Sequence, residues 1–261
     1  MTNTIEAVFF DLDGTLFENK NQVVPPSALE CLYQLKEKGI KIIICSSRAP
    51  EEMEHFPREV YDLFDLVVQS GGTIILEKGE VLRKIPFVHS QIKQVIAYCD
   101  QHEIVCRYST PSQGGYFSKY KRDDVDGIFA YLYHTMPGQK PYEDEEVTGF
   151  YAYQTDDDTK AALAALIPDA NIINLRRVLE FTPKGVNKGS AMAWCCEYLK
   201  VDPNHTMAFG DGYNDIPLFE KAALSVAVGN AREEVQKAAD FVSKRNDEDG
   251  IRYALKHFGL V

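Results

Sequence analysis

The chain has 261 residues, of which 28 are Lys or Arg and 39 are Asp or Glu, so its formal net charge at pH 7 is −11. With 45% hydrophobic and 26% charged residues, the composition is that of an ordinary soluble globular protein, which excludes a disordered, collagen-like or coiled-coil chain. The acidic balance argues against a nucleic acid or an anionic membrane surface as the partner. The length allows one large domain or two modest ones.

The cysteines and the N-terminus predict the compartment. The six cysteines are too sparse for a disulfide scaffold and form no CxxC pair, so we expect small buried thiols rather than a zinc site. The chain starts without the basic stretch and long apolar run of a secretory signal, and no apolar run approaches the roughly 20 residues of a membrane span. These features predict a protein of the reducing cytoplasm that has no membrane partner.

The first third of the chain predicts a strand–helix–strand unit. The apolar run at 5–10 is typical of a strand that is buried on both faces of a parallel sheet. Residues 27–30, Ser-Ala-Leu-Glu, have the pattern of a capping box, and leucines at helical spacing follow until Gly39, a natural helix stop. A second buried strand at 40–45 completes a right-handed parallel crossover.

The pattern changes in the middle of the chain. A helix is expected after Pro50, a strand near 65–68, and a hairpin over 72–85 with its turn at 77–80. From about 83 to 182, aromatic and alternating patterns are common and helical stretches interrupt them, which predicts an α+β segment.

The last third returns to a parallel α/β rhythm. The expected elements are helices at 189–199, at 215–223 and from Ala231, and strands at 206–209, 224–228 and 241–242. The fold class is therefore α/β, with a parallel core that is split in sequence by an inserted α+β domain. We place the first part of the core at 1–82, the inserted domain at 83–182 and the second part of the core at 183–261.

Two carboxylates follow the first predicted strand. Asp11 and Asp13 are two residues apart, so in an extended chain they lie on the same side, at the strand end where ligands bind in open α/β sheets. Acidic groups there form an oxygen site that suits Mg²⁺. A solvated turn rich in aspartate is the alternative. A calcium loop does not fit, because Leu16 and Gln22 stand where that loop needs glycine and glutamate.

Acidic residues also follow the predicted strand at 206–209. Asp211 comes shortly after the strand end, and Asp215 lies one helical turn further along. A Gly-Asp-Gly sequence is also a common turn, so this motif alone is only moderately specific. Two acidic strand ends in one α/β chain are less expected by chance, and together they favour one shared site.

Two further polar groups complete the pattern. Ser46 follows the second predicted strand, where its hydroxyl could donate to a phosphate oxygen, although a helix cap is the ordinary role of such a serine. Lys188 opens a predicted helix, and positive charge at a helix N-terminus favours an anion. A lysine that faces solvent is the alternative.

Together, DLDGT at 11–15, Ser46, GVNKG at 185–189 with Lys188, and GDGYND at 210–215 resemble the four motifs of the haloacid dehalogenase superfamily. The inserted segment lies between the second and third motifs, as in the C2-capped, Cof-type sugar phosphatases of that superfamily. The resemblance spans nearly the whole chain. It implies a Rossmann-like parallel-sheet core, an inserted α+β C2-type cap and a phosphatase that depends on Mg²⁺.

The resemblance also implies a role for the acidic residues. Asp11 would be the nucleophile that takes the phosphoryl group as an aspartyl phosphate. Asp13 would protonate the leaving group and then activate water. Mg²⁺ would be held by Asp11, by the backbone carbonyl of Asp13 and by Asp211, while Asp215 would support the metal site or orient Lys188.

The phosphate group has its own set of implied ligands, carried over from the same motifs. The backbone N–H groups of two residues would join three side chains. The set consists of Leu12 and Ser47 through their N–H groups, and Ser46, Lys188 and Asn214 through their side chains.

Two positions depart from the family pattern. The Cof-type branch has Thr-Gly-Arg at the second motif, whereas this chain has Ser46-Ser47-Arg48, so a side chain replaces the glycine beside the phosphate. The branch has Asn-Gly after the third strand, and here Ser70 takes the asparagine position. Substrate contacts at Ser70 are therefore not carried over.

Other residues of the inserted domain favour structural roles. Its aromatic side chains, such as Tyr151 and Tyr153, are expected in the core. Arg107 and Lys119 could reach a second anionic group of a substrate, but we expect both to be solvated, like most surface cations. The run of aspartates at 156–158 predicts a helix N-terminus.

The sequence thus predicts a Mg²⁺-dependent hydrolase of a small phosphorylated metabolite, with a hexose or related sugar phosphate as the first expectation. We expect a monomer or a small homo-oligomer. A sugar phosphomutase or phosphotransferase stays open, as does a phosphatase for nucleotides, flavin mononucleotide or pyridoxal phosphate. From other classes, a silent binding protein and a phospho-receiver module are alternatives, but a receiver needs neither the inserted domain nor a leaving-group acid.

Overall fold

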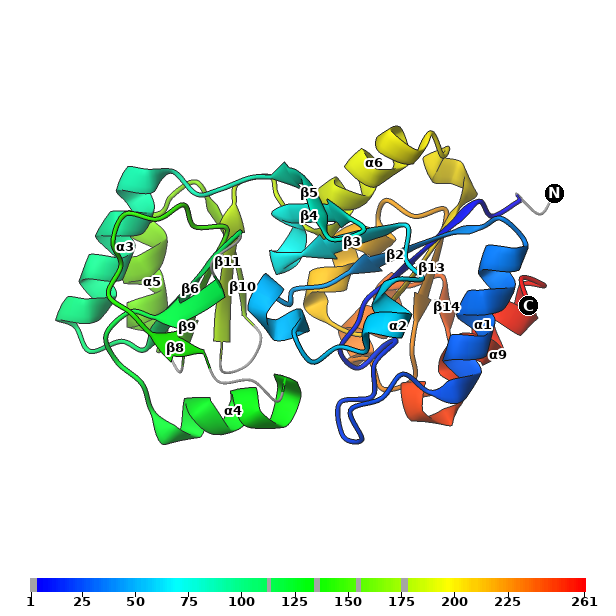
Figure 1. Cartoon of the computed structure of the whole chain (residues 1–261), viewed down its shortest axis with the longest axis horizontal. Coiled ribbons are helices and arrows are strands. Elements are labelled where there is room, and N and C mark those ends of the chain that lie inside the picture. Colours follow the sequence, from blue (N-terminus) through cyan, green and yellow to red (C-terminus); the bar gives the residue numbers. More distant parts are fainter. Residues whose placement is uncertain (1–3, 112–113, 134–136, 154–155, 175–177) are drawn as a thin grey trace.

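The computed structural model describes residues 4–111, 114–133, 137–153, 156–174 and 178–261. Figure 1 shows two lobes side by side, each built on its own β-sheet. The lobe that contains the first and last parts of the chain is called the core domain below, and the lobe built from the middle of the chain is called the cap. The α/β class and the inserted α+β domain that the sequence predicts are both present.

The core domain contains an eight-stranded sheet in the order β14-β13-β12-β1-β2-β3-β4-β5. At its centre, β1 pairs in parallel with β2 on one side and with β12 on the other. The hairpin β4–β5 runs antiparallel at one edge. The strands are β1 (Ala7–Phe10), β2 (Lys41–Cys45), β3 (Leu66–Gln69), β4 (Ile74–Glu77), β5 (Glu80–Lys84), β12 (Thr206–Gly210), β13 (Leu224–Ala227) and β14 (Phe241–Val242).

Helices cover both faces of the core sheet. Because successive residues of a strand point to opposite faces, Val8 and Phe10 of β1 pack with α1 and α9, whereas Ala7 and Phe9 pack with α6, α7 and α8. Both faces are apolar, which explains the continuous apolar runs of the central strands. The helices are α1 (Pro26–Glu37), α2 (Arg58–Tyr61), α6 (Lys188–Leu199), α7 (Ile216–Phe219), α8 (Glu233–Ala238) and α9 (Gly250–His257).

The cap contains a six-stranded sheet in the order β10-β11-β9-β6-β7-β8. One face packs on α3 and α5 through apolar residues such as Tyr108, Phe150 and Phe181. On the other face, Phe129 of α4 packs against Phe117. The elements are α3 (His89–Gln101), β6 (Cys106–Thr110), β7 (Gly114–Phe117), α4 (Asp123–Tyr133), β8 (Gly138–Gln139), β9 (Gly149–Tyr153), α5 (Asp157–Leu166), β10 (Ala170–Asn174) and β11 (Val178–Pro183).

The chain passes between the two sheets close to the boundaries expected from sequence. Strand β5 of the core sheet ends at Lys84, and strand β11 of the cap sheet ends at Pro183. The three segments expected from sequence, core at 1–82, cap at 83–182 and core at 183–261, stay our proposal for the domains, with each boundary just before one of these strand ends.

Local predictions are confirmed in some places and corrected in others. The hairpin is present, and its two turn residues, Lys78 and Gly79, have φ values of 50° and 87°, a conformation that glycine adopts without strain. The capping box at 27–30 is wrong, because α1 begins at Pro26, whose fixed φ suits the first helical position, and no side-chain cap forms. The helix expected at 215–223 is shorter, since α7 ends at Phe219.

Three further expectations are confirmed, for the cysteines, for the two cap tyrosines and for the aspartate run at 156–158. All six cysteines are buried free thiols. Tyr151 and Tyr153 are buried, and Asp156 caps α5 by accepting the N–H of Thr159. In the part of the chain that the structure describes, no helix has the length and apolar character needed to cross a bilayer.

Candidate active site

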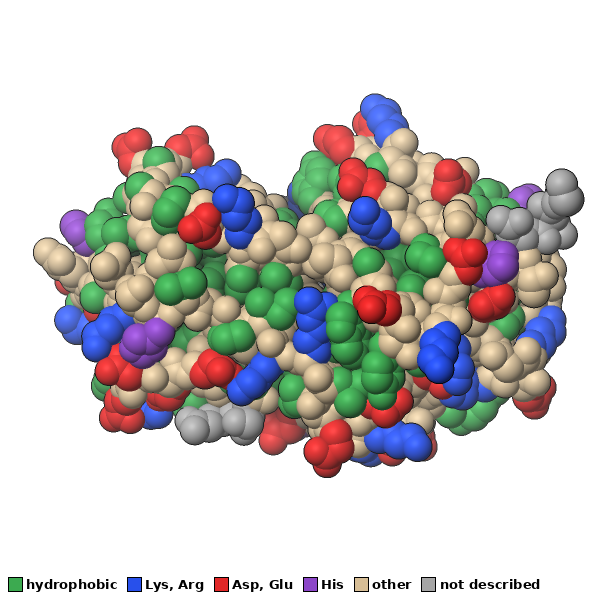
Figure 2. All heavy atoms as spheres, turned by 90° about the horizontal axis from the view of Figure 1, so that it is seen from above, with side chains coloured by type: hydrophobic (Ala, Val, Ile, Leu, Met, Phe, Trp, Pro, Cys, Tyr) green, Lys and Arg blue, Asp and Glu red, His purple; other side chains and the backbone are tan. Residues whose placement is uncertain are grey.

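The predicted acidic residues meet at one edge of the core sheet. Asp11 directly follows β1, Ser46 directly follows β2 and Asp211 directly follows β12, and these three parallel strands are neighbours. Their carboxyl ends therefore bring residues from distant parts of the chain together, as expected for an open α/β sheet. The two lobes also meet at an indentation of the surface, which Figure 2 shows from above.

Lys188 joins two of the acidic side chains. It is the first residue of α6, and it is 1% exposed. Its Nζ lies 2.5 Å from Oδ1 of Asp11 and 2.6 Å from Oδ1 of Asp215. Burial by itself would lower the pKa of Lys188, but Asp11 and Asp215 outweigh burial and raise it, so the ammonium group stays charged. The alternative of a lysine that faces solvent is wrong.

Asp215 fixes the turn that carries Asp211. While Oδ1 of Asp215 binds Lys188, its Oδ2 accepts the backbone N–H groups of Asp211 and Gly212, each at 2.9 Å. Both oxygens of this fully buried carboxylate are therefore engaged in holding other groups. Asp215 thus holds the backbone of the turn and the side chain of Lys188 in place.

The turn after β1 packs directly against Asp211. The hydroxyl of Thr15 donates to Oδ1 of Asp211 at 3.2 Å. Gly14 has a φ of 83°, and a Cβ atom there would lie 2.7 Å from Oδ2 of Asp211. Only glycine combines that backbone conformation with so close an approach of a carboxylate. The glycine and threonine of the DLDGT motif therefore place Asp211 beside Asp11.

The acidic cluster has the charge and geometry for a divalent cation. One carboxylate oxygen from each of Asp11, Asp211 and Asp215 lies within 4.8 Å of the others. When all three are ionised, Lys188 compensates one negative charge and two remain. Burial and then Asp215 raise the pKa of Asp11 to about 7, and burial and then Asp11 raise the pKa of Asp211. These residues fit Mg²⁺, which binds oxygen ligands and favours ionised carboxylates.

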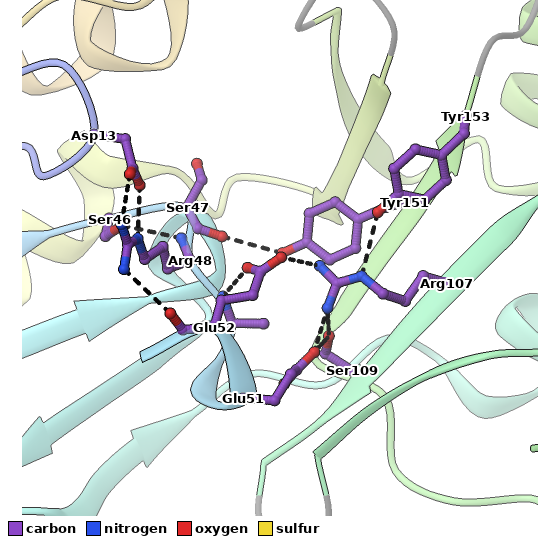
Figure 3. Close-up of polar contacts among 11 residues, drawn as sticks. Asp13, Ser46, Ser47, Arg48, Glu51, Glu52, Arg107, Ser109, Tyr151 and Tyr153 are labelled. Carbon is purple, nitrogen blue, oxygen red and sulfur yellow. Dashed lines mark hydrogen bonds and ion pairs between the residues drawn. The ribbon is translucent and has the colours of Figure 1, made fainter. Parts of the chain in front are cut away.

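Asp13 is held by Arg48 instead of joining that cluster. Nε and Nη2 of Arg48 donate to the two carboxylate oxygens of Asp13 at 2.9 Å and 2.7 Å (Figure 3). Nδ2 of Asn19 donates to Oδ1 of Asp13 at 2.6 Å. Arg48 is 2% exposed, and its guanidinium lies 4.8 Å from the centre of the Phe17 ring. A bidentate pair of this kind fixes the plane of a carboxylate as well as its position. The side chain of Asp13 is therefore pre-oriented.

Two of the predicted phosphate ligands border the acidic cluster. The hydroxyl of Ser46 accepts the N–H of Arg48 at 3.0 Å, which leaves its own proton available for donation. Leu12 has a buried apolar side chain, and its carbonyl accepts the N–H groups of Thr15 and Phe17. The resemblance assigns the backbone N–H of Leu12, and not this side chain, to the phosphate.

Ser47, which replaces the family's glycine, links the core domain to the cap. Nδ2 of Asn214 donates to its hydroxyl at 2.9 Å, and the hydroxyl donates to Oε2 of Glu180 at 3.0 Å. The hydroxyl of Tyr151 donates to the carbonyl of Ser47 at 3.2 Å. The side chain that replaces the family's glycine therefore contacts Glu180 of the cap.

The cap strands present a row of polar groups to the core domain. Arg107 of β6 lies opposite Tyr151 of β9, which in turn lies opposite Glu180 of β11, and all three are buried. Oε1 of Glu180 has no hydrogen-bond partner among the described residues. Burial raises the pKa of Glu180 to about 7, although the hydrogen bond from Ser47 opposes this shift. An unpaired carboxyl oxygen thus lies close to the strand-end site.

The expectation that Arg107 is a solvated cation is wrong. It is 1% exposed, because Glu51 and Glu52 of the core domain neutralise it in a buried cluster. Sequence reasoning also missed any role for Arg48, although that residue stands in the second motif, and for Glu180. The available signal was weak: Glu180 is a charged residue that alternates with apolar neighbours in a strand, which resembles an ordinary solvent-facing position.

Comparison with known proteins places these features in a wider group. A protein-family model described as haloacid dehalogenase-like hydrolase matches residues 8–255. A putative phosphatase of Bacillus subtilis, YkrA, is 27% identical over 268 residues, which cover 97% of this chain and 98% of the relative. A phosphoglycolate phosphatase of Methanobrevibacter smithii is 27% identical over 259 residues, which cover 98% of this chain and 99% of the relative.

Solved structures match both domains together. The HAD subclass IIB sugar phosphatase BT4131 superposes with a TM-score of 0.89 at 30% identity and covers 98% of this chain and 100% of its own. A protein studied for a trigonal-bipyramidal intermediate in a phosphoryl-transfer superfamily gives a TM-score of 0.91 at 28% identity, covering 99% of this chain and 100% of its own. The core domain and the cap are thus a shared architecture.

Proposed function

This chain belongs to the haloacid dehalogenase-like hydrolases and is a phosphatase, and on that basis we propose that it hydrolyses small sugar phosphates through an aspartyl phosphate on Asp11. Lys188 carries this proposal, because one buried ammonium group contacts both Asp11 and Asp215 and so joins the strand ends into a single site. Phosphoryl transfer depends mainly on positioning and on neutralising charge, and both are available here.

The proposed reaction has two in-line steps. In the first, an oxygen of Asp11 attacks phosphorus, the bond from phosphorus to the leaving oxygen breaks, and Asp13, which enters this step protonated, gives that oxygen its proton. In the second, water attacks phosphorus, Asp13 takes a proton from the water, and the bond to Asp11 breaks to release phosphate. Two such displacements replace one difficult displacement. Arg48 orients the carboxyl of Asp13 for both.

Positive and hydrogen-bonding groups hold the phosphoryl oxygens during both steps. Lys188 supplies a full charge from beside the nucleophile. The neutral hydrogen-bond donors orient the phosphoryl oxygens, since a hydrogen bond prefers a near-linear geometry. The proposed ligands are the side chains of Ser46, Lys188 and Asn214 and the backbone N–H groups of Leu12 and Ser47.

The proposed metal ligands are the carboxylates of Asp11 and Asp211 and the backbone carbonyl of Asp13. Bound there, Mg²⁺ would reduce the repulsion between an anionic nucleophile and an anionic ester. Asp215 holds the backbone of Asp211 and the ammonium of Lys188 in place. The charge that remains in the acidic cluster after pairing with Lys188 supports this assignment.

Two observations support sugar phosphates as the substrate class. BT4131, which shares the whole architecture, is named a sugar phosphatase. In this chain, the cap presents Glu180 with an unpaired oxygen near the site, and such an oxygen suits a substrate hydroxyl. The free thiols of all six cysteines suit a reducing compartment, so we propose the cytoplasm as the location.

A phosphate-release screen tests the proposal. Hexose phosphates, nucleotides and pyridoxal phosphate are supplied with and without Mg²⁺, and Asp11→Asn serves as the inactive control. We expect Mg²⁺-dependent release, fastest with sugar phosphates and absent from the variant. No release from any monoester, or equal release by Asp11→Asn, would overturn the assignment. Faster release from a nucleotide or from pyridoxal phosphate would keep the reaction and change the substrate class.

A further inference from the structure

A single buried arginine ties the cap to the core domain. Arg107 lies on β6 of the cap, and its Nη2 donates to Oε1 of Glu52 at 2.7 Å, while Nη1 binds Glu51 (Figure 3). Within the cap, it donates to the hydroxyls of Ser109 at 3.2 Å and Tyr153 at 3.3 Å. Glu51 and Glu52 belong to the core domain, so the contact crosses the interface between the domains.

The two glutamates lie on a short 3₁₀ helix, Pro50–Met53, which begins just after Arg48. The side chain of Glu52 accepts the N–H of Ala49 at 2.7 Å, and its backbone carbonyl accepts Nη1 of Arg48 at 3.2 Å. The same turn therefore holds Arg107 of the cap on one side and Arg48 on the other. Arg48 in turn holds both carboxylate oxygens of Asp13.

The surface of the cap fits closely around the carboxylate of Glu51. A Cβ atom on Gly115 of β7 would lie 1.6 Å from an oxygen of Glu51, so this carboxylate lies in a space that only glycine leaves open. The guanidinium of Arg107 lies 4.4 Å from the centre of the Tyr151 ring and 5.0 Å from that of Phe129. The cap therefore meets the 3₁₀ helix in one specific arrangement.

The donors of Arg107 are used by protein groups. Its contacts with Tyr153, Glu51, Ser109 and Glu52 engage four of the roughly five N–H donors of a guanidinium. Two carboxylates also face its single positive charge. A second anionic group of a substrate would therefore bind only weakly beside this guanidinium, which argues against a substrate-binding role for Arg107.

The energetics of the contact between Arg107 and the two glutamates favour a role in aligning the domains over a role in stabilising the fold. Burying charged groups costs hydration free energy, and the attraction between them offsets that cost only in part. Because the contact joins two domains, a separation of the domains would let water hydrate Arg107, Glu51 and Glu52 again, and the contact could then re-form. A buried pair of this kind selects one geometry of the closed state more than it strengthens the fold.

We propose that Arg107 is a positioning residue: with the cap closed, it seats Glu51 and Glu52, fixes the 3₁₀ helix and so holds Arg48 against Asp13. Alignment of the general acid then depends on cap closure, and leaving-group protonation is efficient only in the closed state. This inference rests on the proposed function, since it assigns Asp13 the acid role there.

The test compares two leaving groups in Arg107→Met. The parameter kcat/KM reports steps up to departure of the leaving group, so it isolates acid catalysis in the first step. A sugar phosphate releases a poor alkoxide that needs a proton, whereas p-nitrophenyl phosphate releases a stable phenolate. We expect kcat/KM to fall by roughly tenfold to a hundredfold for glucose 6-phosphate and by under about threefold for p-nitrophenyl phosphate. Equal losses for both substrates, or none, would overturn the inference.

Companion variants separate alignment from a general effect on the fold. Arg122→Met removes a half-exposed cap arginine that pairs with Asp124, and it should leave kcat/KM unchanged for both substrates. Glu52→Gln keeps the shape of the turn and should show the same dependence on leaving group, which covers the case in which Arg107→Met does not fold. With Asp13→Asn as background, Arg107→Met should add no further loss for glucose 6-phosphate, because residues that act through one group are not additive.

A crystal structure gives a readout that does not depend on turnover. In Arg107→Met with the cap closed, we expect the turn at 50–53 to shift and at least one hydrogen bond between Arg48 and Asp13 to be lost. An unmoved turn with both bonds retained would overturn the inference, whichever phosphate ester the enzyme proved to hydrolyse. Absence of phosphatase activity in the wild type would count against the proposed function alone, while the structural result would still decide the coupling.

Discussion

Arg48 and Asp13 form a bidentate ion pair, with N–O distances of 2.9 Å and 2.7 Å, that links the turn after β2 to the turn after β1. Both carboxylate oxygens are engaged, so the pair sets the direction of the carboxyl group as well as its place. Lysine could supply the charge at this position but not two parallel hydrogen bonds, because an ammonium group is a compact point charge. The arginine therefore bears on catalysis through geometry.

Replacing the guanidinium of Arg48 by another positively charged group should slow the reaction. We expect Arg48→Lys to lower kcat/KM for a sugar phosphate by roughly tenfold to a hundredfold, the range of general acid catalysis, with little change in the melting temperature. Asp13→Asn should be slower still and should slow both phosphorylation of Asp11 and its hydrolysis, which rapid-quench kinetics can separate. Full activity in Arg48→Lys would show that orientation of Asp13 does not limit the rate.

Removal of the nucleophile should leave the fold intact. Asp11→Asn deletes one of three clustered carboxylates, so it relieves repulsion with Asp215 while keeping a similar shape. We expect phosphate release to vanish and the melting temperature to stay the same or rise. Release can be measured with a phosphate dye and stability by circular dichroism. Residual turnover near the wild-type rate would mean that another group attacks phosphorus.

Loss of the buried ammonium should cost stability. Lys188→Met leaves Asp11 and Asp215 buried without their counter-charge, and breaking a buried pair from one side costs about 3–5 kcal/mol. Urea unfolding measures this loss. The matched control is Lys184→Met, which removes an exposed lysine paired with Asp169 and should cost under about 1 kcal/mol. A similar small cost for both variants would contradict the central role of Lys188.

The stability of the protein should depend on pH through Glu180. Burial raises its pKa from 4.5 to about 7, so the folded protein binds this proton more tightly than the unfolded chain does. Its contribution to stability is complete below about pH 4.5 and is lost as the pH rises through about 7. The free energy of unfolding of the wild type minus that of Glu180→Gln should fall over this range, by at most about 3 kcal/mol.

Urea unfolding of both proteins at pH 5 and pH 8, the two sides of the raised pKa of about 7, measures that difference. Glu59→Gln, at an exposed glutamate of α2, controls for the substitution itself. A difference that rises with pH would reverse the sign and exclude a buried, protonated Glu180.

Magnesium should stabilise the folded protein through the acidic cluster. A ligand that binds only the folded state adds about 2.7 kcal/mol at a concentration of about 100 times its Kd. We expect Mg²⁺ to raise the melting temperature of the wild type and a chelator to reverse the rise. Asp211→Asn should abolish the effect, whereas Asp169→Asn, at an exposed aspartate, should retain it. Equal responses in both variants would place the cation elsewhere.

From the amino-acid order alone, the α/β class, the inserted cap and the acidic strand ends were predictable. The reason is that each depends on local patterns. Continuous apolar runs indicate strands buried on both faces, and a polar residue after such a run marks the strand end, where parallel strands bring their carboxyl ends together. Asp11 and Asp211 could therefore be assigned to one site before any coordinates, and the family resemblance added Lys188. The structure places these three side chains together.

The partners of those residues depend on tertiary structure. Arg48, Arg107 and Glu180 sit in sequence contexts that are equally typical of surface charges, and their burial follows from which strand face meets the other domain. Arg107 pairs with Glu51 and Glu52 only because the cap sheet lies over the 3₁₀ helix, a contact between segments far apart in the chain. Local periodicity shows which side chains share a face, but the packing of the two domains decides what that face touches.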